Sequence, residues 1–290
     1  DYEQIHPKPI LYTIISYLIG FVLIVLYLLI SEYFNLRINS KYGVENYLKL
    51  PVIGVVGILS VHKKAKGSRK INDQYFISRT TPLLSPELEG YRTIRTNIQF
   101  QSVDNPIKSI LVTSSVTGEG KTVTSFNLAV VMAMDNKKTV VIDADLRKVV
   151  KKELLEDEDF NQIGLTSYLL GEVMIDDIVS ETLIPNLMVI NTGPTPSNPA
   201  ELLSSQRMSR LIQKLKARYD FVIIDSPSLT FSDPTIMATK VDGCIFVVHS
   251  GVTKVNVAEQ ALELLKNVNA PIIGAVLNKD LIKVERYGTK

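Results

Sequence analysis

Short apolar runs that alternate with longer helical stretches constrain the fold of this chain most strongly. Strands covered by helices on both faces of a sheet have this uniformly apolar, β-branched composition. The runs cover residues 110–113, 139–142, 187–190, 221–224, 244–248 and 272–277, and the helical stretches between them include 122–134, 199–217 and 255–267. The alternation predicts an α/β domain with a doubly wound, mainly parallel sheet.

The start of the chain has a different character, because residues 10–30 carry no charge. At about 1.5 Å per residue, a helix over this run would cross a hydrocarbon core roughly 30 Å thick. A signal peptide would have a basic start, a shorter apolar region and small residues at a cleavage site. A buried core helix is the other alternative. Lysine and arginine follow the run at Arg37, Lys41 and Lys49, which predicts a transmembrane helix with its C-terminal side in the cytoplasm.

Composition restricts the possible partners and sites. The chain has 290 residues, 46% of them hydrophobic, which suffices for a buried core, and 32 basic against 30 acidic residues give a net charge of +2. This balance gives no sign of a nucleic-acid partner. The single cysteine, Cys244, excludes an internal disulfide and fits a reducing compartment. The histidines lie far apart in sequence, so we predict no zinc site.

Shifts in composition divide the chain into successive parts. Residues 1–35 form the transmembrane helix and its flanks, and 36–59 form a cytoplasmic segment whose amphipathic helical pattern ends near Pro51. Residues 60–84 are basic and polar, which is typical of a solvated linker, although contact with anionic lipid headgroups is an alternative. The α/β domain covers 85–290 and opens with a helix at the capping-box-like sequence SPEL.

The sequence VTGEGKT, at 116–122, follows a predicted strand and opens a predicted helix. Backbone N–H groups in such a loop converge on phosphate oxygens, Lys121 can reach the β- and γ-phosphates, and the Thr122 hydroxyl can bind Mg²⁺. Ser115 stands where the strict pattern has its first glycine. The predicted nucleotide-binding residues of the loop are Thr117, Gly118, Glu119, Gly120, Lys121, Thr122 and Val123.

Carboxylates follow two of the other predicted strands. Asp143 and Asp145 end the run TVVIDAD, and Asp225 ends FVIID. Ligands bind beyond the carboxyl ends of strands in this architecture, and hard oxygen ligands suit Mg²⁺. We therefore predict a metal site from Thr122, Asp143 and Asp225, the alternative being that each aspartate caps the following helix.

Together these motifs resemble the bacterial tyrosine kinases of capsule and exopolysaccharide systems, a branch of the P-loop proteins related to MinD and ParA. SSVTGEGKTVTSFNLA resembles their Walker A loop, VVIDADLR their Walker A′ motif and FVIIDSP their Walker B motif. EGYRTIRTNIQF is similar to the E-x-x-R-x-x-R oligomerisation motif, with Glu89, Arg92 and Arg95 at its fixed positions, and TGPTPSNPAELLSS is similar to a further family segment. Val116 occupies the position of the signature lysine of MinD and ParA, which favours the kinase branch.

The N-terminal part resembles a second protein of these systems. HPKPILYTI, the apolar run and YGVENYLKLPVIGVVG are similar to the last transmembrane helix and cytoplasmic tail of a polysaccharide co-polymerase, whose tail activates the kinase. The chain departs from the kinase pattern at Thr117, where proline is frequent, and at Ser228, where a second proline is usual. Tyr287 alone represents the C-terminal tyrosine cluster.

The resemblance implies a tyrosine kinase at the bacterial inner membrane that depends on ATP and Mg²⁺ and is assembled as a ring of identical subunits. Its implied substrates are tail tyrosines of a neighbouring subunit, such as Tyr287, and other proteins of capsule synthesis. In this interpretation Lys121 stabilises phosphate charge and Asp143 orients or deprotonates the acceptor. Asp145 supports the metal and loop geometry, and Asn278 contacts adenine. Glu89, Arg92 and Arg95 form the ring contact.

Two other functions fit the same motifs. The first is a membrane-tethered ATPase switch of the MinD/ParA kind without kinase activity, which the few terminal tyrosines keep open. The second is a catalytically silent nucleotide-binding partner of a polymerase. Phosphotyrosine on the purified protein would separate the kinase from both.

Overall fold

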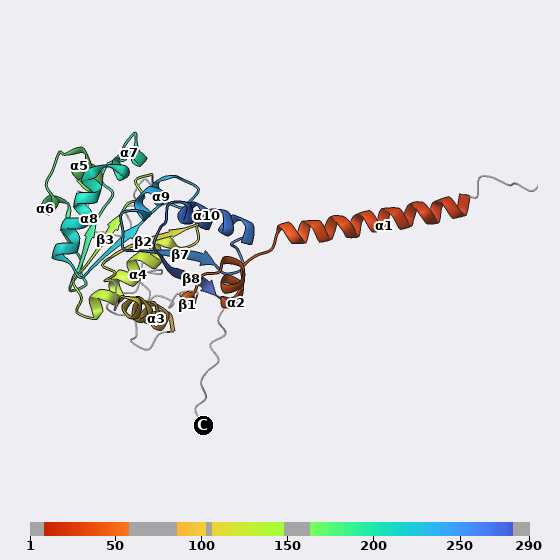
Figure 1. Ribbon diagram of the computed structural model, residues 1–290, viewed down its shortest axis with the longest axis horizontal. Helices are drawn as coiled ribbons and strands as arrows, with labels where there is room; N and C mark the ends of the chain where they lie inside the picture. The colour runs from red at the N-terminus through yellow and green to blue at the C-terminus, as the bar shows by residue number, and fades with distance from the viewer. Residues whose placement is uncertain (1–8, 58–85, 103–105, 148–162, 281–290) are drawn as a thin grey trace, which may run out of the picture.

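The computed structural model describes residues 9–57, 86–102, 106–147 and 163–280 (Figure 1). The predicted linker at 60–84, the capping residue Ser85 and the predicted acceptor Tyr287 lie outside these residues.

An isolated helix, α1 (Pro9–Phe34), extends away from the rest of the protein (Figure 1). Its apolar part, Ile10–Ile30, has 21 residues and a mean hydropathy of 2.7, and none of it is buried inside the protein. A core helix would be covered by its own domain, so that alternative does not apply. By length and composition α1 can cross a membrane.

Within the described residues, one eight-stranded sheet has the order β1-β8-β7-β2-β6-β3-β5-β4. Neighbouring strands are parallel except β4, which pairs antiparallel with β5 at one edge. The strands are β1 (Val52–Gly57), β2 (Ser109–Ser114), β3 (Thr139–Asp143), β4 (Ser180–Glu181), β5 (Leu187–Ile190), β6 (Phe221–Asp225), β7 (Gly243–His249) and β8 (Ile272–Asp280). Each of the six short apolar runs predicted as strands forms one, and the predicted doubly wound fold is confirmed.

Helices cover both faces of the sheet (Figure 1). One apolar cluster lies under α3 (Pro86–Gln101) and α4 (Lys121–Met134). The other lies under α5 (Leu165–Leu170), α8 (Gln206–Arg218), α9 (Asp233–Ala238) and α10 (Val255–Asn267), with the short helices α6 (Ile175–Ile178) and α7 (Pro199–Ser204) beside it. Residues of one strand alternate between the clusters, because successive side chains point to opposite faces.

The single helix predicted over 199–217 is wrong, since the chain forms α7 and α8 there. Ser205 leaves the helical conformation, with φ −59° and ψ 157°, and its hydroxyl accepts a hydrogen bond from the Met208 N–H at 3.3 Å. An N-cap serine satisfies one of the unpaired donors at a helix start. The apolar periodicity continues through both helices, so it does not reveal this break.

Residues 36–57 contain the helical turns that their amphipathic pattern predicted and an edge strand that the sequence did not predict. They form α2 (Lys41–Gly43), the π-helical turn η1 (Val44–Leu48) and the edge strand β1, which pairs with β8. Helix α3 covers β1 closely: a methyl group at Gly90 would lie 2.7 Å from the Val55 carbonyl oxygen, and Asn97 Nδ2 donates to the Ile53 carbonyl at 2.8 Å. The strand is therefore built into the α/β domain.

Candidate active site

The loop between β2 and α4 has the shape that phosphate binding requires. Gly118 and Gly120 have φ of 93° and 98°, in the left-handed region that glycine adopts without strain. Helix α4 begins at Lys121, so the N–H groups of its first turn and its positive dipole end lie at the loop. Lys121, the predicted phosphate-binding lysine, is the first residue of the helix and is buried.

The predicted metal ligands Thr122 and Asp225 lie together. Thr122 Oγ1 donates to Asp225 Oδ2 at 2.6 Å, and Ser125 Oγ donates to Asp225 Oδ1 at 3.2 Å. Asp225 is fully buried at the end of β6 and points to α4, so the alternative that it caps the helix following β6 does not hold. A hydroxyl and a carboxylate this close are oxygen donors of the kind that suits Mg²⁺ beside phosphates.

Asp143 and Asp145 follow the adjacent strand. Asp143 is the register partner of Asp225, and its Oδ1 accepts the Asp145 N–H at 3.1 Å. The structure therefore brings the predicted carboxylates to one edge of the sheet, beside the loop. Across the described residues, no group of three or more histidine, cysteine, aspartate or glutamate side chains could by itself hold a metal ion. A magnesium ion here would depend on phosphates and water for its remaining ligands.

Glu119 points into the protein and not toward the phosphate site. Its carboxylate accepts from the Ser115 hydroxyl at 2.9 Å, from the Val116 N–H at 2.9 Å and from the Thr253 hydroxyl, and its side chain is 1% exposed. Ser115, at the position of the missing first glycine, thus holds the loop through Glu119. Glu119 contributes backbone to the site, while its side chain fixes the loop shape.

Asn278, expected at the adenine, lies in β8 against the same loop. Its Nδ2 donates to the Glu119 carbonyl at 2.9 Å, and a methyl group placed on Gly120 would come within 1.9 Å of that nitrogen. Gly120 is therefore required both for its backbone conformation and for the room it leaves. The adenine contact of Asn278 stays a prediction.

An ion pair that the sequence did not predict fixes the Walker A′ segment. Arg147 donates to fully buried Asp233 through Nε at 2.7 Å and Nη2 at 3.0 Å, and its guanidinium stacks 4.6 Å from the centroid of the Phe231 ring. The hydrogen bond to Asp233 raises the pKa of Arg147 further above its usual value. The pair joins the segment after β3 to the start of α9.

The two departures from the kinase pattern meet in space. Thr117 Oγ1 lies 3.3 Å from Ser228 Oγ, and Ser228 is in turn hydrogen-bonded to Thr230. Where the family pattern has prolines, this chain has a pair of hydroxyls that joins the phosphate loop to the loop after β6.

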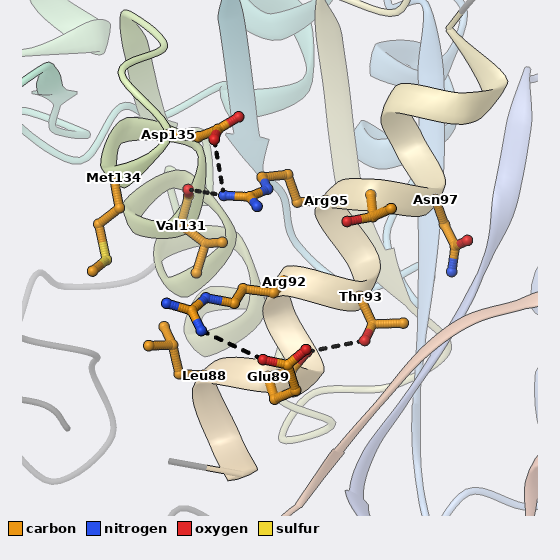
Figure 2. Close-up of a pocket in the computed structure, with 10 residues that line it drawn as sticks. Leu88, Glu89, Arg92, Thr93, Arg95, Asn97, Val131, Met134 and Asp135 are labelled. Atoms are coloured by element: carbon orange, nitrogen blue, oxygen red, sulfur yellow. Dashed lines mark hydrogen bonds and ion pairs between the residues drawn. The ribbon is translucent and has the colours of Figure 1, made fainter. Parts of the chain in front are cut away.

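Glu89, Arg92 and Arg95 lie on α3 around a surface pocket of about 700 Å³ (Figure 2). Arg92 Nη1 is 3.5 Å from Glu89 Oε2, and Arg95 Nη1 contacts the Val131 carbonyl at 3.3 Å and Asp135 at 3.5 Å, near the end of α4. These arginines have partners within their own subunit, so a subunit contact would have to replace or extend these bonds.

Comparisons with known proteins decide the family. Residues 107–281 match the AAA domain family. The chain is 42% identical over 228 residues to the tyrosine-protein kinase YwqD of Bacillus subtilis, a match that covers 78% of this chain and 94% of that protein. The chain belongs to the bacterial tyrosine-protein kinases.

Among solved structures, the kinase resembles the chimerical protein CapA2B2, with a TM-score of 0.69 and 32% identity over 83% of this chain and 99% of that one. It also resembles the kinase domain of Escherichia coli tyrosine kinase ETK, with a TM-score of 0.72 and 25% identity over 84% and 95% of the two chains.

Sequence reasoning missed Thr253 and Asp233, which hold Glu119 and Arg147. No motif marks either residue, because each partner lies far away in the chain, 134 residues from Thr253 and 86 from Asp233.

Proposed function

We propose that this kinase transfers the γ-phosphoryl group of ATP to tyrosine hydroxyls, including Tyr287 in the tail of a neighbouring subunit. The observation that carries the proposal is the meeting of the helix start at Lys121 with the Thr122–Asp225 pair, whose atoms lie 2.6 Å apart, in a chain of this family. Phosphoryl transfer depends chiefly on positioning and charge neutralisation, which such a site supplies.

Each residue has a distinct part in this reaction. Lys121 and the loop amides stabilise charge on the β- and γ-phosphates, and Thr122 and Asp225 hold Mg²⁺, which supplies charge neutralisation when bound. Asp143, beside Asp225 in the sheet, orients the acceptor hydroxyl or takes its proton. Asp145 supports the turn through its bond to Asp143.

The experiment is incubation of the full chain with Mg²⁺ and ATP, followed by phosphotyrosine mass spectrometry. Lys121→Met should lower phosphotyrosine by orders of magnitude, and Tyr287→Phe should remove its own site without changing ATP binding. ADP production without phosphotyrosine would favour the ATPase switch instead. Phosphotyrosine that survives Lys121→Met would contradict the assigned role of Lys121.

The proposed oligomer rests on the E-x-x-R-x-x-R motif, whose residues line the α3 pocket. We infer that charged side chains of a neighbouring subunit enter between Arg92 and Arg95, since both intrachain contacts are long at 3.5 Å and weak pairs exchange easily. Arg92→Ala with Arg95→Ala should lower the mass measured by light scattering, whereas Arg210→Ala, on the exposed face of α8, should not. An unchanged mass would refute this contact.

The wider role proposed here is regulation of capsular or exopolysaccharide synthesis, chain length and export at the inner membrane. The apolar part of α1, Ile10–Ile30, is not buried inside the protein and supports a membrane anchor. Residues 36–59 are proposed as the activator segment, and the pairing of β1 with β8 within the described part, 36–57, supports this. Deletion of the gene should change the length distribution of the polymer, and restoration with Lys121→Met should fail to correct it.

A further inference from the structure

The turn after β7 lies between the phosphate loop and the segment that follows the membrane helix. Thr253, in this turn, is 2% exposed. Its hydroxyl donates to the Glu119 carboxylate and accepts the His249 N–H at 2.9 Å. A threonine hydroxyl has a single hydrogen to donate, and here Glu119 receives it.

Glu119 depends on this donor. A buried carboxylate is tolerated only when hydrogen bonds replace its lost hydration. Among the described residues, the other donors to it are Ser115 and Val116, both within the loop itself. Thr253 therefore supplies the donor that comes from outside the phosphate loop, and it fixes where the loop sits relative to β7.

The backbone of the same turn is paired with the chain leaving the membrane. Ile38 N–H donates to the Thr253 carbonyl at 2.9 Å, Gly251 N–H donates to the Ile38 carbonyl at 2.7 Å, and Val255 N–H donates to the Leu36 carbonyl at 2.9 Å. The Arg37 guanidinium adds a bond to the Gly251 carbonyl at 3.2 Å. This short ladder begins two residues after α1 ends.

A second connection runs through the same turn. Ser250 N–H donates to the Asn278 carbonyl at 2.9 Å, and the Asn278 side chain donates to the Glu119 carbonyl at 2.9 Å. Both the carboxylate and the carbonyl of Glu119 are thus held by groups that the 250–253 turn contacts. A displacement of the turn would disturb the loop at both points.

We propose that Thr253 is a positioning residue that couples residues 36–38, at the exit of the membrane helix, to the phosphate loop through Glu119. The coupling regulates the proposed ATP site and so rests on the proposed function. When residues 36–38 are paired with the turn, Thr253 holds Glu119 and the loop is shaped for phosphates. When that pairing opens, the donor is lost and affinity for ATP falls.

The test measures the affinity of the full chain in detergent micelles for a fluorescent ATP analogue with Mg²⁺. Thr253→Val removes the hydroxyl at nearly constant shape and should weaken binding roughly tenfold, the usual effect of leaving a charged hydrogen-bond partner unpaired. Thr253→Ser retains the donor and should restore binding. Thr239→Val is the matched control, because its exposed hydroxyl donates to the Ile236 carbonyl at the end of α9.

A double-mutant cycle tests the connection to the membrane side. Ile38→Pro removes the N–H that bonds Thr253, and it should weaken ATP binding in the parent but add little when combined with Thr253→Val. If Ile38→Pro does not fold, Arg37→Ala replaces it in the cycle as a milder perturbation, because it removes only the side-chain bond to the Gly251 carbonyl. The proposal is overturned if Thr253→Val binds ATP like the parent, or if the effects of the two sites simply add.

The readout separates this proposal from the kinase assignment, because ATP affinity is measured without phosphoryl transfer. If the losses of ATP affinity are coupled but the chain forms no phosphotyrosine, the role of Thr253 is supported and the kinase activity is contradicted. If the chain forms phosphotyrosine but the losses of affinity add, the kinase activity is supported and the role of Thr253 is contradicted.

Discussion

The ion pair between Arg147 and Asp233 gives a sharp test of the site architecture. Asp233 is 0% exposed and receives both of its Arg147 bonds at 2.7 and 3.0 Å. Loss of one partner from a buried pair typically costs about 3–5 kcal/mol, because the other charge stays buried. The Arg147 side chain is 35% exposed, so water can approach from its side. We therefore expect Arg147→Met to cost about 3 kcal/mol, at the lower end of that range.

For a domain of this size, a loss of about 3 kcal/mol lowers Tm by roughly 6–12 °C. The assay is thermal unfolding of the full chain in detergent, followed by circular dichroism. Arg218→Met is the matched control, since Arg218 pairs with Asp176 on the surface, where both side chains are largely exposed and such pairs contribute at most about 1 kcal/mol. Equal Tm shifts for the two variants would refute the reasoning, because they would mean that Asp233 gains its hydration elsewhere.

Three further predictions concern buried groups and the phosphate loop. Burial raises the pKa of Cys244 to about 12, so iodoacetamide should alkylate this thiol only after the chain unfolds in urea, and labelling of the folded chain would contradict the burial. The contribution of the thiol to the free energy of unfolding should fall as pH rises above the unfolded thiol pKa of about 8.5. Gly120→Ala should weaken ATP binding roughly tenfold, because strain at φ 98° and displacement of Asn278 cost about 1–3 kcal/mol; unchanged binding in a titration would contradict the packing argument. Thr117→Val and Ser228→Ala should show a coupling energy of about 0.5–1 kcal/mol in ATP affinity, and additive effects would mean that their hydroxyls do not interact.

The sheet was predictable because burial on both faces leaves a signature in each strand. Every core strand is a short apolar run with few charges, and each run can be recognised from its own sequence without knowing which strands lie beside it. The edge strand β1 escaped prediction because Val52–Gly57 follows a helical pattern and contains two glycines. The break at Ser205 escaped because a cap changes the backbone without changing the apolar periodicity.

The candidate active site likewise has a part that the sequence predicts and a part that it does not. Lys121 and Thr122 were predictable because a contiguous loop carries them, and Asp225 because it ends a strand. The inward direction of Glu119 could not be predicted, since it is fixed by Thr253, more than a hundred residues away in the chain. Contacts of that kind depend on the order of strands in the sheet, which local patterns do not encode.

The balance of charge at the site leads to one more prediction. Lys121 begins α4 beside the edge of the sheet where Asp143, Asp145 and Asp225 lie, while the carboxylate of Glu119 is directed inward and is held by its own donors. A triphosphate without a metal would meet more negative than positive charge there, and in a partly buried site such repulsion is poorly screened.

We therefore expect ATP to bind much more weakly in EDTA than in Mg²⁺, and we expect Asp225→Asn to reduce that difference by removing both a repulsive charge and a metal ligand. Asp220→Asn is the matched control, because Asp220 caps the Lys138 N–H at the opposite end of β6. Calorimetric titration of each variant in both buffers gives the comparison. If the parent and Asp225→Asn lose affinity equally in EDTA, then Asp225 neither repels the phosphates nor holds the metal, and the nucleotide must be positioned by the loop amides and Lys121 alone.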